Sequence, residues 1–494
     1  MKNLYDFLTS LCKDRNMKIE DLQKKLGVSR STLYRYMKGV NQISPELAQS
    51  FINALNMDTQ EVLSFTKSIS LSVFDQSLVQ SRYVIDDFLF ETSPKQKTIV
   101  DIDMIFYNND KYLRTLREVF SLIYSFSVRE NFRGNAKIVN CLDENIFLHL
   151  TSFLEEVFGN ELNMEIEHFV GLSENSYLQT AATFINIFPL MKYEKYKLYY
   201  REKEMEGVLM NDSILFSLEY TENGNVCKRY FSISFYEHGM PECIAFSDIY
   251  MHSFMSKNFE NLKHSFNNIL QKYDSMDFVD DILLNIQKDF GNYIIKPNPC
   301  YDKIPYDAMK SATGRMDEKE LIELMSSMYE GVNDSDTMRM ALDTALEFVK
   351  RRIEYTYNHE QIDVYSRSGM LEFVRTGKLT DHLERLVAFN HNEIRLVIEH
   401  IRRRNNDPND AYKVYITEDE LPRKDLIILV LKNYGILIEY VYPHDKKDLW
   451  KMLLIQSNRL ASIFCDYIEN HIPVSLAMSK DKADSFLQEL IDGF

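Results

Sequence analysis

The sequence predicts a multidomain protein in which a small all-α head precedes a large α/β (α+β) body. With 494 residues, the chain exceeds the size at which a single hydrophobic core stops growing, and it suggests about three domains. Short amphipathic segments with their own start and stop signals fill the first 65 residues, whereas strand-like and helix-like patterns alternate from residue 131 onward. Such alternation favours a sheet that contains parallel strands and is covered by helices.

Five helices are expected within the first 65 residues. The first covers residues 4–15, where apolar side chains recur at the spacing of one helix face. The second covers residues 19–26 and ends at Gly27, which lacks a Cβ and therefore tolerates the positive φ of a sharp turn. Ser29 follows as a favourable N-cap for the third helix, because its hydroxyl can accept a backbone N–H of the first turn.

The last two helices of the head carry their own start signals. Ser44 and Pro45 combine an N-cap with a proline at the first helical position. Residues 58–61, with the sequence DTQE, have the form of a capping box for a fifth helix. Because capped helices succeed one another without a break, the segment is expected to fold as one domain over residues 1–67.

The turn and the third helix carry the most specific motif of the chain. Residues 26–32 read LGVSRST, and residues 17–63 as a whole resemble the Cro/phage-repressor (Xre-type) DNA-binding domain. The resemblance implies a helix-turn-helix whose third helix lies in the major groove of double-stranded DNA. Since such domains usually bind paired half-sites, a homodimer is also expected. The resemblance implies DNA contacts from the outer side of that helix and the loop after it: Arg30, Ser31, Thr32, Tyr34, Arg35, Lys38 and Asn41.

The residue types at these positions fit base readout and phosphate contact. Arg30 can pair bidentately with guanine O6 and N7, and Tyr34 can cover a thymine methyl group. Lys38 and Asn41, in the loop after the third helix, suit contacts to phosphate. Such contacts position a protein on DNA without reading its sequence. Two positions depart from the family. Ile19 stands where a phosphate-anchoring Gln is usual, and Gln23 stands where the two helices cross and a small residue is usual.

Charge is distributed unevenly between the head and the body. Residues 1–60 contain nine Lys/Arg and six Asp/Glu, a formal charge of +3, which leaves −20 for the rest because the whole chain carries −17. Basic groups release counterions from DNA on binding, whereas an acidic surface is repelled by phosphate. The charges therefore confine DNA contact to the head.

Strand and helix patterns divide the rest of the chain into four segments. The first segment, residues 68–130, could either dimerise the heads or simply pack onto the body, and the sequence favours neither role. The expected segments are a helical connector over 68–130 with a helix at 111–127, an α/β effector domain over 131–275, a mostly helical stretch over 276–360 and a C-terminal α+β domain over 361–494.

Individual elements of the body follow from the same patterns. In the effector domain, strands are expected at 136–142, 164–171, 195–200, 213–220 and 228–236, helices at 144–157 and 177–190, and a turn at 223–225. Farther along, we expect a helix at 336–357 capped by Ser335, a strand at 362–365, a helix at 393–404, a small antiparallel sheet within 412–442, and closing helices at 449–470 and 482–491.

The body shows little catalytic chemistry. The phosphate-binding GxxxxGK[ST], the dinucleotide-binding GxGxxG, and the HExxH and GxSxG motifs are all absent. The chain is therefore not expected to be an enzyme, and no cofactor, metal ion or catalytic residue is assigned. Three features are interpreted as structural: His168 as a hydrogen-bonded sheet histidine, Glu393 with His400 as part of a solvated helix rather than a metal site, and residues 402–404 (RRR) as a solvated helix end rather than a site for an acidic ligand or for the acidic body of a partner subunit. Arg367 and Arg375, near Gly369 and Gly377, could grip an anion, but no such site is assigned.

Cysteine usage and hydropathy point to the cytoplasm. The six cysteines are scattered and form no CxxC motif, which is typical of thiols in a reducing compartment. The longest apolar run, residues 181–191, has about half the length that a bilayer span requires and contains Pro189. Asp6 interrupts the apolar start, so no signal peptide is expected.

The sequence thus favours a sequence-specific DNA-binding transcriptional regulator. Its large body would sense a small molecule, a peptide or a protein and modulate operator binding. The alternative is an interaction protein of phage defence or lysogeny control, whose body binds another protein while the head localises it on DNA. A third hypothesis, an enzyme that regulates its own gene, lacks the motifs that it would need.

Overall fold

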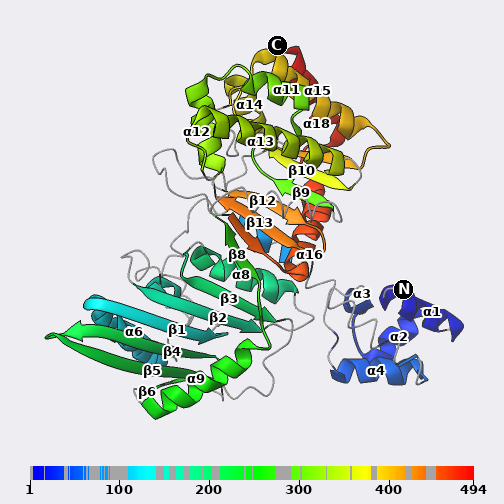
Figure 1. Cartoon of the computed structure of the whole chain (residues 1–494). Coiled ribbons are helices and arrows are strands. Elements are labelled where there is room, and N and C mark those ends of the chain that lie inside the picture. Colours follow the sequence, from blue (N-terminus) through cyan, green and yellow to red (C-terminus); the bar gives the residue numbers. More distant parts are fainter. Residues whose placement is uncertain are drawn as a thin grey trace. The chain divides into compact units, whose positions relative to one another are not determined.

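The computed structural model describes most of the head and the cores of the body (Figure 1). By contacts, the chain forms two compact units, Met1–Val84 with Asn175–Ala182, and Ile85–Glu174 with Thr183–Phe494. The described residues are 4–15, 17–37, 43, 45–58, 110–140, 150–154, 163–171, 177–191, 193–201, 212–237, 241–246, 249–273, 291–300, 303–329, 331–356, 359–379, 387–418, 426–440 and 452–493, with short stretches between 61 and 89.

Four helices of the head have bounds close to those expected from the sequence. They are α1 (Leu4–Asp14), α2 (Ile19–Leu26), α3 (Arg30–Met37) and α4 (Pro45–Leu55). Their core contains fully buried side chains from every helix and from the fifth helical region: Leu8, Leu22, Leu33, Phe51 and Phe65. Residues 61, 62 and 65 are helical, but the bounds of the fifth helix lie outside the described residues.

The caps of the head explain why its helices begin and end where they do. Gly27 has φ +66° and donates its N–H to the carbonyls that end α2. Ser29 Oγ accepts the N–H of Thr32 at 3.1 Å, which confirms the expected N-cap of α3. Asp58 and Glu61 exchange two hydrogen bonds of 2.9 Å, the reciprocal pattern of a capping box. The expected cap at residue 44 lies outside the described residues.

The first sheet of the body begins with parallel strands and continues with antiparallel ones. In space the order of its seven strands is β6-β5-β4-β1-β2-β3-β7, with β1, β2 and β3 parallel. The expected turn at 223–225 is confirmed by positive φ at Asn223 and Gly224, which suits a tight hairpin. The strands are β1 (Glu130–Val139), β2 (Met164–Gly171), β3 (Tyr196–Arg201), β4 (Ser213–Glu222), β5 (Asn225–Glu237), β6 (Pro241–Phe246) and β7 (Asn267–Asn268).

Helices cover both faces of this sheet (Figure 1). Successive residues of β4 point to opposite faces. Phe216 meets Phe120 of α6 (Asp110–Ser127), with 6.2 Å between the ring centroids. Leu215, on the other face, joins the cluster of Met255 and Phe259 from α9 (Ile249–Lys263). A further helix, α8 (Tyr177–Met191), connects β2 to β3, and residues 150–154 are helical within the expected helix at 144–157.

The second sheet also has seven strands, in the order β11-β10-β9-β12-β13-β14-β8. Its strands are β8 (Leu270–Tyr273), β9 (Asn292–Ile295), β10 (Gln361–Ser366), β11 (Tyr412–Thr417), β12 (Leu426–Leu431), β13 (Gly435–Tyr440) and β14 (Met452–Ile455). Its helices are α11 (Tyr306–Thr313), α12 (Glu318–Met328), α13 (Ser335–Thr356), α14 (Arg367–Thr376), α15 (His391–Asn406), α16 (Asn458–Asp466), the π-helix η4 (Tyr467–His471), α17 (Ile472–Ser475) and α18 (Lys480–Asp492).

The two sheets repeat one topology. In each sheet a central strand, β1 or β9, is the first of three adjacent parallel strands. The other side of this strand pairs antiparallel with β4 or β12, which is followed by its hairpin partners. When the two sheets are aligned at the ends of their first strands, His168 corresponds to Asp363 and Tyr196 to Tyr412. In both sheets the tyrosine hydroxyl bonds the polar side chain of the middle strand, at 2.8 and 3.0 Å. The two sheets of the body thus share one strand topology and one tyrosine contact at matching positions.

The structure corrects three sequence predictions around the second sheet. The expected helix at 449–470 begins with β14. A short strand that the sequence analysis did not expect, β9, also lies in the stretch over 276–360, whose described residues are otherwise mostly helical. Both strands are short and wholly buried, and an apolar run of this length gives no periodicity that separates strand from helix. Strand β11 pairs parallel with β10 instead of joining the antiparallel hairpin β12–β13. Asp334, not Ser335, caps α13, because its carboxylate accepts the N–H groups of residues 336 and 337 at 3.0 and 2.9 Å.

None of the described helices combines the length and the apolar composition needed to cross a membrane.

Candidate nucleic-acid interface

Helix α3 is held in the head by one face and presents the other to solvent. Leu33 and Met37 are fully buried against the core of the head. Arg30, Ser31 and Arg35 are exposed on the opposite side. An α-helix with its side chains is about 10–12 Å in diameter, which is about the width of the major groove of B-DNA. The exposed face of α3 is thus of a size that fits the groove.

Arg30 is loosely held at the start of α3. Its guanidinium lies 3.6 Å from Oε1 of Glu20 and 6.0 Å from the ring centroid of Tyr34. Tyr34 is itself half-buried beside Tyr5 of α1, with 6.3 Å between the centroids. Because the side chain of Arg30 remains 63% exposed, its five N–H donors are accessible to a partner.

The hydroxyl groups at the start of α3 form a small cluster. Ser29 Oγ lies 3.0 Å from Ser31 Oγ and 2.7 Å from Thr32 Oγ1. Thr32 is half-buried and donates its backbone N–H to Ser29 Oγ, so it supports the start of α3. Ser31 is exposed beside Arg30. The expected contacts from Lys38 and Asn41 lie outside the described residues.

One of the two departures from the family has a structural explanation. Ile19 packs against the core of the head, so an apolar contact stands at the start of α2 where the family usually has a phosphate-anchoring Gln. Gln23, the other departure, is half-buried. Two other polar side chains of the head serve its architecture: Arg15 binds Glu61 at 2.5 Å, and Lys25 donates to the carbonyl of Ala54 at 3.1 Å.

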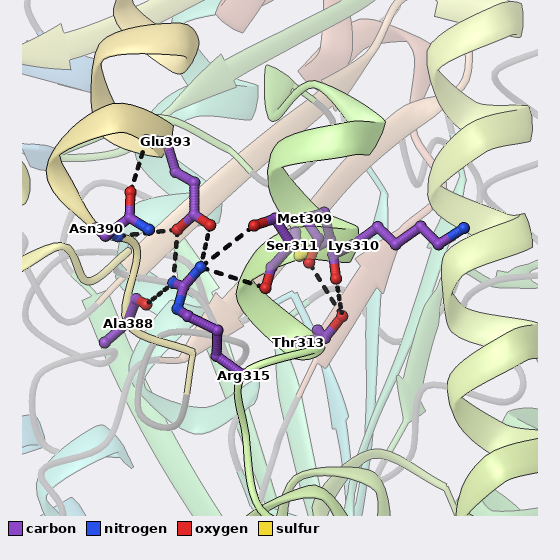
Figure 2. A network of polar contacts seen from close by, with 8 residues as sticks. All are labelled: Met309, Lys310, Ser311, Thr313, Arg315, Ala388, Asn390 and Glu393. Carbon is purple, nitrogen blue, oxygen red and sulfur yellow. Dashed lines mark hydrogen bonds and ion pairs between the residues drawn. The ribbon is translucent and has the colours of Figure 1, made fainter.

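In the body, Glu393 belongs to a structural clamp (Figure 2). The residue is only 3% exposed, so the expectation of a solvated helix is wrong for Glu393. Arg315 donates to both carboxylate oxygens of Glu393, at 2.6 Å for one of the two bonds, and to the carbonyl of Ala388 at 3.0 Å. Asn390 and Glu393 also form the capping box that begins α15. The clamp joins the end of α11 to the start of α15. Among the described residues, no group of three His, Cys, Asp or Glu side chains could hold a metal ion.

The arginine run at 402–404 also has partners inside the body. Arg402 binds Asp484 through two bonds of 2.7 and 2.9 Å. Arg404 binds Asp410 at 2.7 and 3.0 Å, and only 3% of its side chain is exposed. The expectation of a solvated helix end is therefore wrong for Arg404. The sequence does not indicate this ion pair, which lies where α15 packs on β11.

The two arginines weighed as an anion grip have different partners. Arg367 lies over the ring of Phe486 at 5.7 Å, whereas Arg375 is 75% exposed and lies 3.9 Å from Glu372. The glycine between them has a steric role. A Cβ at Gly369 would stand 2.2 Å from the carbonyl oxygen of Pro297, so this residue allows α14 to pack closely on the segment after β9.

His168 is a fully buried sheet histidine with both ring nitrogens bonded, as the sequence predicts. Its Nδ1 lies 2.8 Å from Tyr196 Oη, and its Nε2 lies 2.8 Å from the carbonyl oxygen of Asn140. Burial lowers the pKa of His168 to about 4, although the hydrogen bond to Asn140 opposes the shift. The ring is therefore neutral at neutral pH.

This histidine is expected to make the body less stable in mild acid. The unfolded chain protonates His168 near its ordinary pKa of about 6.5, whereas the folded protein does so near 4. Between these values the unfolded state binds more protons, so stability falls as pH decreases, by roughly 3 kcal/mol in all. Urea unfolding at pH 7 and pH 4.5 measures the loss. His168→Gln should reduce the pH dependence in this window, and an unchanged slope in that variant would contradict the assignment.

Comparison with known proteins identifies the head. Residues 8–62 match the helix-turn-helix family HTH_3. The N-terminal part of the chain is therefore an Xre/Cro-like helix-turn-helix, a domain of DNA-binding regulators. A search of curated protein sequences gives no match. The solved phosphatidylserine synthase of Haemophilus influenzae Rd KW20 aligns with 76% of this chain and 91% of its own, at 10% identity and a TM-score of 0.21, which is too low to support any conclusion about the body.

Proposed function

We propose that the chain is a sequence-specific transcriptional regulator that acts as a homodimer and places α3 in the major groove of each half-site. The observation that carries the proposal is the exposed face of α3, with Arg30, Ser31 and Arg35, in a segment that matches the helix-turn-helix family. Two such heads would bind half-sites about 34 Å apart. In this proposal the body has a regulatory role and no catalytic one.

Arg30→Ala is expected to weaken binding to the cognate operator by roughly 1–3 kcal/mol, because a bidentate contact to guanine would be lost. An operator is first obtained by selection from random duplexes, and affinity is then measured by fluorescence anisotropy. Lys13→Ala is a suitable control, since it removes one exposed cation of the same head from α1. If both variants lost the same affinity, Arg30 would act only through its charge.

We further propose that the body controls the head through the segment around residues 85–89, which belongs to the connection between the head and the body. Ile85, Phe88 and Leu89 of this segment are buried. The Phe88 ring packs edge-on against Phe188 of α8, with 5.0 Å between the centroids. Asp86 accepts a hydrogen bond of 2.6 Å from Tyr467 in η4. An effector that shifts η4 or α8 would therefore move the start of the connection to the head. It can do so only if it binds the two arrangements unequally.

Asp86→Ala is expected to loosen this attachment. The variant leaves the buried hydroxyl of Tyr467 without its acceptor, at a local cost of about 1–3 kcal/mol. Hydrogen exchange of residues 85–89 should speed up, and any effector-dependent change in operator affinity should shrink. Tyr467→Phe removes the same hydrogen bond from the other side and should give the same exchange pattern. Unchanged exchange in both variants would show that this contact does not hold the segment.

A second candidate function has one specific observation in its favour. Helix α9 exposes large apolar side chains near its start: Ile249 at 52%, Tyr250 at 83% and Phe254 at 59%. Exposed apolar surface of this kind is typical of protein-binding sites. The body would then bind another protein while the head localises it on DNA. Tyr250→Glu with Phe254→Glu should leave operator binding intact, and a loss of regulation in the cell without a change in small-molecule binding would favour this candidate.

A further inference from the structure

The feature that carries a further inference is the outer edge of the first sheet. The strand orders leave four end strands in the body, β6 and β7 in the first sheet and β8 and β11 in the second (Figure 1). Strand β6 pairs along its whole length with β5, and none of the other described strands lies on its second side. An end strand of this length presents a row of backbone N–H and C=O groups with which a further strand can pair.

The other three end strands differ from β6. Strands β7 and β8 are only two and four residues long. They belong to one segment that joins the sheets, since Ile269 between them donates its N–H to Leu198 of β3 and accepts the N–H of Gln456 after β14. Strand β11 is longer, but the segment after α17 pairs with its end, and the carbonyl of Ile416 accepts the N–H of Met478 at 2.8 Å. In the described part of the body, β6 is thus the long end strand whose outer side has no partner.

Apolar side chains are exposed beside this edge. Helix α9 begins at Ile249, three positions after the last residue of β6. Its His252 packs over β4 and β5, with 3.0 Å from Nε2 to Ser217 Oγ and 4.8 Å between its ring centroid and that of Tyr230. In the same turns of α9, Tyr250 and Phe254 are 83% and 59% exposed. The outer edge of β6 and these exposed rings therefore lie at the same side of the sheet.

The same surface carries little negative charge. The whole chain has a formal charge of −17, so two bodies repel each other over most of their surfaces. The stretch from Ile249 to Phe259 contains one lysine and no Asp or Glu, and β6 contains one carboxylate, Glu242. A second copy of the chain can therefore approach here with less repulsion, and the apolar rings gain from being covered.

We propose that this surface is the dimer interface of the body, in which β6 pairs antiparallel with β6 of a second copy of the chain. The proposal rests on the proposed function, which requires two heads on two half-sites, and it names the surface that joins them. A two-fold axis between the two β6 strands makes each the partner of the other, so one edge is sufficient. The first sheets of both copies join into one, and both α9 helices lie on the same face of it, where their exposed rings meet the other copy.

The test compares Phe254→Glu with Met340→Glu. Both substitutions place a carboxylate at an exposed apolar position, since Met340 of α13 is 71% exposed. The mass of the full chain in solution is measured by analytical ultracentrifugation over a range of concentrations, and melting temperatures verify folding. Hydrogen exchange of the backbone amides of residues 242–246 is followed over the same range.

The wild-type chain should form a dimer, and exchange at residues 242–246 should slow as the concentration rises through the dissociation constant. Phe254→Glu should raise this constant by about 30-fold or more, because each copy then places a carboxylate in an apolar contact. Its exchange should no longer depend on concentration over the same range. Met340→Glu should change the dissociation constant by about twofold or less.

Two results would overturn this interface while leaving the proposed function intact. One is a dimer that Phe254→Glu leaves unchanged, and the other is a dimer in which residues 242–246 exchange at a rate independent of concentration. In the first case, the exposed rings of α9 would be open to the other protein of the second candidate function. A wild-type chain that remains monomeric on the selected operator would overturn the proposed homodimer together with its interface.

Discussion

Replacing Arg404 with leucine is expected to lower the free energy of unfolding of the body by about 3–5 kcal/mol. Arg404 and Asp410 form two hydrogen bonds of 2.7 and 3.0 Å, and their side chains are only 3% and 8% exposed. The guanidinium also lies 4.7 Å from the ring centroid of Tyr412. Without it, Asp410 would remain as a buried charge with its main partner removed. The midpoint of urea unfolding, followed by circular dichroism, measures the effect.

Arg402→Leu provides a matched control two residues away on α15. Arg402 binds Asp484 with the same bidentate geometry, at 2.7 and 2.9 Å. Its side chain and that of Asp484 are 32% and 30% exposed, so water can solvate the carboxylate that is left behind. We expect a loss of about 1 kcal/mol or less. If the two arginine variants were destabilised equally, the burial of the Arg404–Asp410 pair would not be what makes it important.

Leu22→Ala is expected to destabilise the head by about 2–5 kcal/mol, because it removes a fully buried side chain and leaves a cavity. A domain of about 60 residues has little stability to spare. The variant should therefore lose operator binding although Leu22 faces away from DNA. Thermal unfolding of the head, followed together with operator affinity, measures both effects.

A neighbouring leucine of α2 serves as the comparison. Leu26 is only half-buried, so Leu26→Ala should cost less stability and should keep most of the operator affinity at low temperature. Full operator binding by Leu22→Ala under conditions where wild type binds would contradict the packing of the head described above.

The head could be predicted from the sequence because its signals are local. Gly27 ends α2 through its own positive φ, Ser29 caps α3 through a residue three positions away, and Asp58 exchanges bonds with Glu61 at the same spacing. Each of these signals lies within one turn of the helix end that it specifies. The bounds of α1 and α2 consequently agree with the expected ones to within one residue, and α3 begins at Arg30, directly after its expected N-cap.

Fewer elements of the body could be predicted from the sequence, because its strands and their order in the sheets depend on pairing between segments that are distant in the sequence. Strands β9 and β14 each span four buried residues, and only their neighbours in the sheet identify them as strands. The topology that the two sheets share is not apparent in the sequence, since the aligned polar positions hold different residues, His168 and Asp363. Pairing registers reveal it instead.

In the candidate site, too, the residues on one helix could be predicted from the sequence, whereas a contact between two helices could not. The resemblance to the family placed Arg30 and Arg35 on the outer face of α3, where the structure has them. It gave no indication that Glu20 lies beside Arg30. The two lie ten positions apart in the sequence, and the packing of α2 against α3 brings them together. In the sequence, Glu20 was noticeable only as an acidic residue at the start of a helix.

The most direct test of the central claim, that α3 of this head reads double-stranded DNA, is selection of bound sequences from a pool of random duplexes with the purified full chain. The wild-type protein should enrich one motif, organised as two half-sites about 34 Å apart. The Arg30→Ala/Arg35→Ala variant, with a folded head verified by its melting temperature, should enrich none. Enrichment of the same motif with the same affinity by the double variant would contradict the account, as would a wild-type protein that enriches no sequence.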